Sequence, residues 1–188
     1  MFDTEQKLQL LKVARESILW GLENDSALSL NENDFAEGLR KHQACFVTLY
    51  KADKLRGCIG SLNASRPLIT DVSHNAYAAA FSDPRFKRIT ETEVDQLTIS
   101  ISVLSVPSPI QFNSEQELLS QLQPGVDGLV ITDGAARATF LPSVWEQLPD
   151  KVDFLNHLKQ KAGFSFSFWS DSIQVSRYFT ESFEEDRD

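Results

Sequence analysis

Apolar residues recur at intervals of three and four along several stretches of the chain, the spacing that places side chains on one face of an α-helix. The stretch over 4–23 is the longest, and Asp3 with Gln6 three positions later predicts a capping box at its start. A second helix is expected from its N-cap at Ser65 to the break at Asp83-Pro84. Two shorter helices are expected after Ser114 and from Val152 to Ala162.

Alternation of apolar and polar residues predicts the strands. It is clearest over 97–103, where Leu, Ile and Val alternate with Thr and Ser, so Ile99 and Ile101 should be buried. Further strands are expected over Ala44–Tyr50 with Leu55–Leu62, over Gly128–Thr132 with Arg137–Leu141, and through Ile173 to Phe179 ahead of an acidic tail. Hairpins mixed with helices, without regular βαβ alternation, predict an α+β fold with a mainly antiparallel sheet flanked by helices.

The first of these hairpins sets the surroundings of Cys58. With a two-residue turn at Ala52-Asp53, the simplest register places Cys58 opposite Val47 rather than opposite Cys45. We therefore expect two free thiols and no disulfide between the two cysteines.

Composition is typical of a globular protein with one domain, which we assign to residues 1–188. The chain has 188 residues, 41% of them hydrophobic, enough for a core that needs neither disulfides nor a structural metal. No apolar run approaches the ~20 residues of a membrane span, and the N-terminus does not have the pattern of a signal peptide. These features predict a cytoplasmic protein with reduced cysteines and no membrane partner.

The net charge of −9 is unevenly distributed. Residues 51–88 contain seven Lys or Arg and three Asp, a surplus of four positive charges in an otherwise acidic chain. The acidic remainder repels phosphate backbones, which argues against a nucleic-acid partner. Within the basic segment, Arg56, Arg66 and Arg85 are candidates for binding a small anionic ligand, and a merely solvated surface is the alternative.

The segment LRGCIG, residues 55–60, has the most unusual combination of side chains in the sequence. In a regular strand Arg56 and Cys58 share one face, and a guanidinium beside a thiol favours the thiolate. Gly57 and Gly60 expose backbone, either for close packing or for the close approach of a ligand. The alternative is that Cys58 is a small buried hydrophobic residue.

Several motifs in this order resemble the AMMECR-domain family, whose microbial members are called AmmeMemoRadiSam system protein A. They include FVTL at 46–49, LRGCIG at 55–60, DPRF at 83–86, TFLP at 139–142 and KAG at 161–163. The resemblance implies an α+β fold in two unequal lobes, the larger holding both chain ends, and does not fix the bounds of the smaller lobe. It also implies a cleft at LRGCIG. Because microbial relatives are often encoded beside Memo-like and radical-SAM proteins, it suggests these as partners, but it implies no particular reaction or cofactor.

Two functions remain open beside a purely structural role for LRGCIG. In the first, the chain is a binding or partner module with a basic, glycine-lined cleft around Arg56 and Cys58. In the second it is an enzyme, or a component of one, in which Cys58 attacks an anionic small-molecule substrate with His157 as base. Many relatives carry another cysteine shortly before KAG, where this chain has Leu158-Lys159-Gln160, so a two-thiol mechanism is disfavoured. We favour the first function, since the sequence offers one plausible nucleophile and no evident base next to it.

Overall fold

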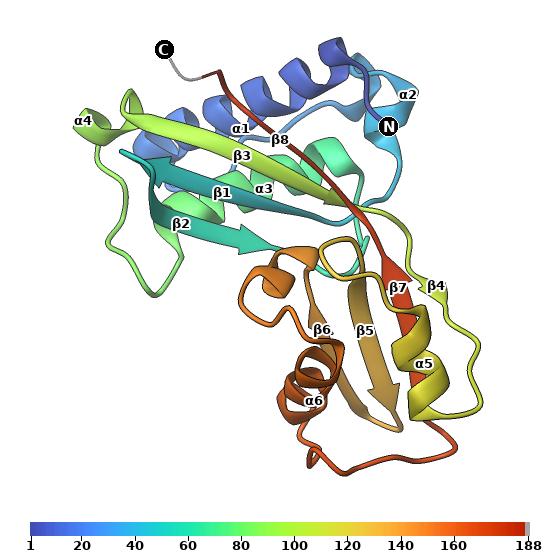
Figure 1. The fold of residues 1–188 in the computed structure, drawn as a ribbon. Coiled ribbons are helices and arrows are strands. Elements are labelled where there is room, and N and C mark those ends of the chain that lie inside the picture. Colours follow the sequence, from blue (N-terminus) through green and yellow to red (C-terminus); the bar gives the residue numbers. More distant parts are fainter. Residues whose placement is uncertain (187–188) are drawn as a thin grey trace. The chain divides into compact units, whose positions relative to one another are not determined.

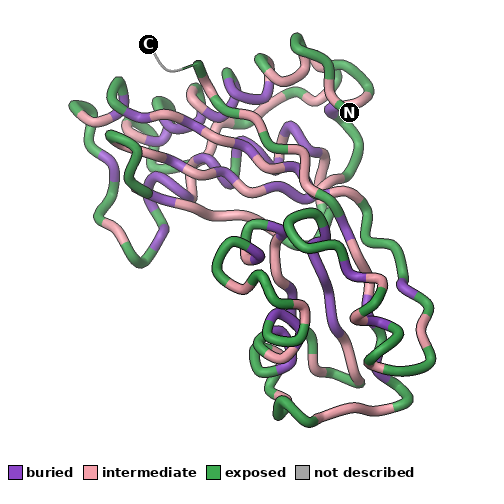
Figure 2. The backbone as a smooth tube through the Cα atoms, in the orientation of Figure 1, coloured by how far each residue is buried: buried purple, intermediate pink, exposed green. Residues whose placement is uncertain are grey.

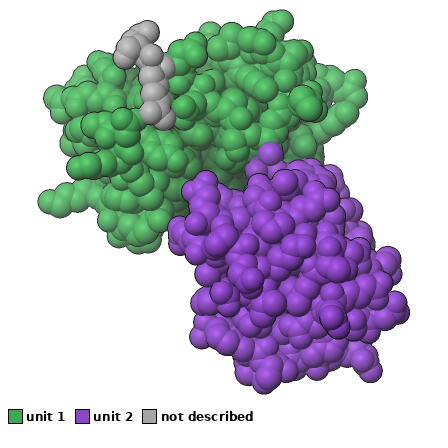
Figure 3. All heavy atoms as spheres, in the orientation of Figure 1, with its two compact units in different colours: residues 1–104, 181–188 green, residues 105–180 purple. Residues whose placement is uncertain are grey.

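The computed structural model describes residues 1–186, and the chain forms two compact units (Figure 3). Unit 1 comprises Met1–Leu104 and the segment that begins at Glu181, and unit 2 comprises Ser105–Thr180. Unit 2 is therefore an insertion within the sequence of unit 1. Within the described residues, no helix is both long and apolar enough to cross a membrane.

Unit 1 is built on a four-stranded sheet in the order β2-β1-β3-β8, with β1 antiparallel to both β2 and β3 (Figure 1). The strands are β1 (Cys45–Lys51), β2 (Lys54–Gly60), β3 (Leu97–Leu104) and β8 (Thr180–Glu184). The helices are α1 (Thr4–Asn24), α2 (Glu37–Arg40), α3 (Leu68–Phe81) and α4 (Glu91–Val94), with a 3-10 turn at Glu32–Asp34. The predicted capping box of α1 is confirmed, because Asp3 and Gln6 each accept a hydrogen bond from the other's backbone N–H.

One face of this sheet packs against helices, with α3 on β1 and β2 and α1 on β3. Ile99 and Ile101 lie on that face and are fully buried, which confirms the prediction. Alternate residues on the other side are only half-buried, as the changing colours along β1 and β3 in Figure 2 show. We call this side the helix-free face; it carries Phe46, Thr48, Tyr50, Thr98, Ser100 and Ser102.

A β-bulge in β2 overturns the simple register of the first hairpin. Ala52-Asp53 forms the expected two-residue turn, with φ values of 48° and 61°. Beyond the turn, β2 contains one extra residue, Arg56, and Cys58 pairs with Thr48. The prediction that Cys58 faces Val47 is therefore wrong by one position. Since side chains alternate along a strand, this single step moves Cys58 from the buried side of the sheet to the helix-free face.

The C-terminal segment also differs from the prediction of one strand and an acidic tail. The chain forms two strands there, β7 (Gln174–Tyr178) in unit 2 and β8 in unit 1. Arg15 of α1 binds one of the acidic residues: its guanidinium donates to both carboxylate oxygens of Glu185, at 2.8 and 2.5 Å. Lys7 of the same helix pairs with Glu181 at 2.9 Å, so Glu181 and Glu185 are partners of the first helix.

Unit 2 has its own four-stranded sheet, in the order β4-β7-β5-β6. Its other elements are β4 (Ser108–Pro109), α5 (Glu115–Gln121), β5 (Gly128–Asp133), β6 (Ala136–Phe140), a 3-10 turn at Pro142–Glu146 and α6 (Lys151–Lys161). The predicted hairpin of β5 and β6 is confirmed, with Gly134 at a φ of 58° in its turn. The core includes Trp145 stacked on Phe154, with ring centroids 3.7 Å apart. The α+β class is confirmed, but the expected strands form two sheets.

Candidate functional site

The bulge at Arg56 places the thiol of Cys58 in a row of hydroxyl groups on the helix-free face. Thr48 Oγ1 donates a hydrogen bond to Cys58 Sγ at 3.3 Å, and Ser100 is the partner of Thr48 on the next strand. Cys58 is half-buried, and both cysteines of the chain are free thiols, as expected. The alternative of a buried, hydrophobic Cys58 fits Cys45 instead, which is fully buried.

Asp83 and Arg85 cap the edge of the sheet at Cys58. Strand β2 lies at that edge, where its outward backbone groups have no neighbouring strand. Asp83 Oδ2 accepts a hydrogen bond from the backbone N–H of Cys58 at 2.9 Å, and Arg85 donates to the Cys58 carbonyl at 3.3 Å. The same two side chains bind each other, with Arg85 Nη2 2.7 Å from Asp83 Oδ2. The pair therefore occupies the place of a further strand.

These contacts shift the pKa values of both side chains. Hydrogen bonds from the Arg85 side chain, and then from the backbone of Cys58 and Arg85, hold the pKa of Asp83 well below its usual range. Asp83 raises the pKa of Arg85, and the thiol of Cys58 contributes in the same direction. The Asp83 side chain is 2% exposed and that of Arg85 is 55% exposed. A cationic group thus lies beside Cys58 with much of its surface in solvent.

Arg56 binds a carboxylate of α4, whereas its position in the sequence suggests a place beside Cys58. Its guanidinium binds Glu93 of α4 through Nε at 3.2 Å and Nη2 at 3.1 Å, and Nη1 donates to the carbonyl of Lys87 at 2.8 Å. Lys51 binds the same carboxylate at 3.1 Å. Hydrogen bonds from Arg56, followed by those from Lys51 and Thr90, lower the pKa of Glu93 to about 2. Arg56 fastens the segment before α4 to the sheet, and Arg85 is the arginine that contacts Cys58.

Close packing accounts for both glycines of LRGCIG. A Cβ atom on Gly57 would lie 2.2 Å from the carbonyl oxygen of Ala79 in α3. A Cβ atom on Gly60 would lie 2.3 Å from the ring of Phe46. Between the two uses that the sequence left open, the contacts favour packing over the approach of a ligand.

Arg66 belongs to a separate cluster around Asp71, a buried carboxylate of α3. Arg66 Nε lies 3.3 Å from Asp71 Oδ1, while Oδ2 accepts from Cys45 N at 3.1 Å, Ser61 Oγ at 2.8 Å and Asn75 Nδ2 at 3.0 Å. Burial, and then the charge of Asp71, raises the pKa of the Cys45 thiol well above its usual value. This cluster ties β1 to α3, and the raised pKa favours the protonated form of the Cys45 thiol.

The helix expected to begin at Ser65 begins later, at Leu68, with Pro67 as its N-cap. Its first backbone N–H, that of Leu68, donates to the carbonyl of Lys41 at 2.9 Å, outside the helix. The prediction of an N-cap at Ser65 is therefore wrong by two residues.

His157, the candidate base, lies on α6 of unit 2, whereas Cys58 belongs to unit 1. Its side chain is exposed, and its Nδ1 lies 2.8 Å from the carbonyl oxygen of Asp153, one turn earlier in the same helix. The hydrogen bond of the His157 ring is therefore local to α6.

Sequence reasoning missed Asp83 and Thr48 as neighbours of Cys58. Asp83 precedes a proline at the end of a helical pattern, a position that indicates a helix terminator. The available signal was the combination Asp-Pro-Arg, which puts an acceptor and a guanidinium two positions apart in a rigid turn. Thr48 could not be identified, because its pairing with Cys58 depends on the bulge.

Comparison with known proteins agrees with this fold. The AMMECR1 family model matches residues 11–183. A protein of Methanothermobacter thermautotrophicus is 35% identical over 179 residues, covering 94% of this chain and 93% of its own. Protein MJ0810 of Methanocaldococcus jannaschii is 35% identical over 155 residues, covering 80% and 77%. The crystal structure of the uncharacterized protein PH0010 from Pyrococcus horikoshii has a TM-score of 0.81 at 29% identity and covers 94% of this chain and 90% of its own. The motifs around Cys58, the α+β fold and these matches together make the chain a member of the AMMECR1 family.

Proposed function

We propose that the chain is a binding module, and that its contact surface is the helix-free face of unit 1 around Cys58 with Arg85 at its rim. Arg85 receives an anionic group, a carboxylate or a phosphate, of the ligand or partner. The observation that carries this proposal is the geometry at Cys58: the bulge turns the thiol outward, and the Asp83–Arg85 pair holds an exposed guanidinium beside it. A cation held in place in advance loses little conformational entropy on binding.

The charges of the basic segment support Arg85 as the anion-binding group. Lys51 and Arg56 share Glu93, and Arg66 is paired with the buried Asp71. These three cations are therefore committed to structural contacts. Arg85 has a partner too, but the Asp83 carboxylate also accepts the Cys58 N–H, and the guanidinium keeps an exposed edge for a second carboxylate or phosphate.

The surroundings of the thiol favour binding over catalysis. The hydrogen bond to Cys58 Sγ comes from a hydroxyl group, whereas a catalytic thiol needs a base in reach to take its proton. Asp83, the nearby carboxylate, is held ionised by Arg85 and faces the backbone rather than the thiol. The second candidate, an enzyme with Cys58 as nucleophile, rests on the outward position of the thiol beside Arg85.

The family resemblance supplies the partners to test: a Memo-like protein and a radical-SAM protein. We expect immobilised wild-type chain to retain at least one of them, and Arg85→Ala to weaken that binding about tenfold. Arg88→Ala is the matched control, since Arg88 is an equally exposed arginine of the same segment, paired with Asp25. Equal loss in both variants, or no binding to either protein by wild type, contradicts the proposal. Cys58→Ser keeps the binding if the chain is a binding module, and a turnover that this variant abolishes favours the enzyme.

A further inference from the structure

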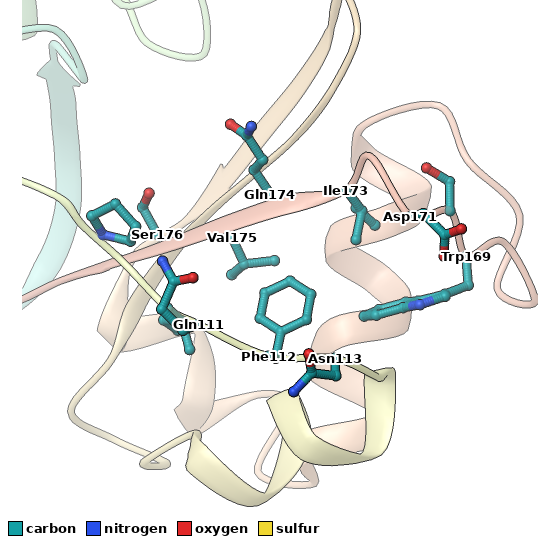
Figure 4. Close-up of a pocket in the computed structure, with 12 residues that line it drawn as sticks. Gln111, Phe112, Asn113, Trp169, Asp171, Ile173, Gln174, Val175 and Ser176 are labelled. Carbon is teal, nitrogen blue, oxygen red and sulfur yellow. The ribbon is translucent and has the colours of Figure 1, made fainter.

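Unit 2 contains a cavity that the function proposed for unit 1 does not use. It has a volume of about 550 Å³, within the range of sites for small molecules. It opens where the chain after β4 leaves β7: Ile110 N still donates to the carbonyl of Val175, at 2.8 Å, and beyond it the two segments separate. Figure 4 shows Gln111 to Asn113 on one side, β7 along another, and Trp169 and Asp171 at the far end.

Two aromatic rings belong to the apolar part of this cavity, beside the aliphatic side chains of Ile110, Ile173 and Val175. Phe112 and Trp169 are half-buried, with ring centroids 5.7 Å apart and planes inclined by 55°. Both rings border the cavity and both keep exposed surface, so they can contact the apolar part of a ligand. An aromatic ring also attracts cations through the negative potential over its face.

The indole of Trp169 lies beside an ion pair between the buried Lys159 and the partly exposed Glu115. Lys159 is fully buried; its ammonium binds Glu115, donates to the carbonyl of Phe166 at 3.1 Å and lies 5.6 Å from the centre of the indole ring. Because Glu115 neutralises Lys159, the pair contributes no net charge beside the cavity. Its effect is to order the segment that carries Trp169.

Acidic groups therefore set the charge at the cavity. Asp171 is the charged side chain among the described residues that line it. Asp133 lies close by, since its carboxylate accepts hydrogen bonds from Ser170 and Ser172, the two neighbours of Asp171, at 2.7 Å each. These bonds lower the pKa of Asp133, so its negative charge persists at neutral pH. A phosphate or carboxylate ligand would be repelled, whereas a cation would be attracted.

We propose that this cavity binds a small organic cation of the alkylammonium class. Asp171 faces the positive charge, the rings of Phe112 and Trp169 contact the alkyl groups, and the carboxamide of Gln111 binds polar substituents. The charge and the two aromatic walls distinguish this ligand from a neutral apolar one of the same shape.

Choline and its neutral analogue 3,3-dimethyl-1-butanol test this distinction, because they have the same shape and differ in charge. The chain has three tryptophans, so the indole N–H signals in ¹H–¹⁵N spectra give one reporter at the cavity and two internal controls. Trp20 belongs to unit 1, and Trp145 Nε1 is bonded to the carbonyl of Asp127 in the core. We expect choline, at up to about 20 mM, to move the Trp169 signal saturably and to bind about five- to tenfold more tightly than the alcohol.

Asp171→Asn should reduce the affinity for choline to that for the alcohol and leave the alcohol unaffected. Asp186→Asn, which removes an exposed aspartate of unit 1, is the control and should change neither. Unshifted Trp20 and Trp145 signals show that each variant is folded. The proposal is overturned if the two compounds bind equally, if choline leaves the Trp169 signal unmoved, or if Asp171→Asn binds choline as wild type does.

Discussion

The carboxylate of Asp83 accepts a hydrogen bond from the backbone N–H of Cys58 at 2.9 Å. This contact joins the DPRF and LRGCIG segments, and it fixes both the edge of β2 and the arginine beside the thiol. Asp83 is almost fully buried, so its charge depends on Arg85 for compensation. The local chemistry of Cys58 therefore depends on a side chain 25 residues away in the sequence.

The first prediction concerns the reactivity of the two thiols. In the folded protein, iodoacetamide should modify Cys58 and leave Cys45 unmodified, since Cys45 is buried and burial raises the pKa of its thiol. Arg85→Gln should slow the modification of Cys58 about two- to fivefold by removing the neighbouring positive charge. Peptide mapping by mass spectrometry measures both sites in one sample.

Arg56→Gln is the matched control for that experiment, because Arg56 binds Glu93 rather than Cys58. If Arg56→Gln slowed the modification of Cys58 more than Arg85→Gln did, this would support a regular strand with Arg56 and Cys58 on one face. Modification of Cys45 at the rate of Cys58 would contradict the burial of Cys45.

The second prediction is a loss of stability in acid that depends on Glu93. Its pKa in the folded state, about 2, lies below the ordinary value of 4.5. The stabilisation is therefore complete above pH 4.5 and is lost as the pH falls from there toward 2. Glu93→Gln should lower the free energy of unfolding by about 2 kcal/mol at pH 7 and flatten its pH dependence in that window. Urea unfolding at a series of pH values measures both effects.

Glu91→Gln, an exposed position of the same helix, serves as the control for Glu93. We expect it to leave both the free energy of unfolding and its pH dependence close to those of wild type. An unchanged acid transition in Glu93→Gln would show that the contacts with Arg56 and Lys51 do not stabilise the fold.

The third prediction tests the close contact between β2 and α3. Gly57→Ala should destabilise unit 1 by about 2–3 kcal/mol, because the new methyl group meets the backbone carbonyl of Ala79, which cannot move without shifting the helix. Gly38→Ala is the comparison: its methyl group meets only the end of the flexible Gln6 side chain. That change should cost less than about 1 kcal/mol, since Ala favours a helix more than Gly does. Thermal unfolding of both variants that shows equal losses would refute the contact.

The fourth prediction concerns the ion pair of Lys159 and Glu115. Glu115→Ala leaves a buried ammonium without its carboxylate and should cost about 3 kcal/mol or more. Lys159→Met removes the charge and keeps the volume, so it should cost less than Glu115→Ala. Gln116→Ala, at the next position of α5, controls for the change in helix propensity. A larger loss of stability in Lys159→Met than in Glu115→Ala would mean that the ion pair itself stabilises unit 2.

The parts of the fold that could be predicted are those set by neighbours in the sequence. The burial of Ile99 and Ile101 follows from alternation within one strand, and the turn at Ala52-Asp53 from its length. The bulge could not be predicted, because the position of Arg56 depends on Glu93, which is distant in the sequence. Because one extra residue moves every later side chain of a strand to the other face, the wrong register also put Cys58 on the wrong face of the sheet.

The sequence pattern indicated where the candidate site lies better than it indicated which side chains contact one another there. Cys58 lies on an accessible face, and Arg85, taken from the charge pattern, lies next to it. Arg56, Arg66 and His157 are each held by contacts elsewhere, with Glu93, Asp71 and the backbone of α6. Charge along the chain does not reveal which acid will pair with which base, because the pairing is decided by the tertiary fold.

The insertion of unit 2 between β3 and β8 has a consequence for synthesis on the ribosome. The neighbouring strand of β3 is β8, which follows unit 2 in the chain, so while unit 2 is being synthesised the edge of β3 stays unpaired and open to other chains. The two ends of unit 2 are bonded to each other: Ser105 N donates to the carbonyl of Phe179 at 2.8 Å, and Phe179 N donates to Ser105 Oγ at 2.9 Å. Once the inserted unit folds, it delivers β8 close to β3 and shortens the loop that remains to be closed. The sheet of unit 1 can therefore be completed only after the inserted unit has been synthesised.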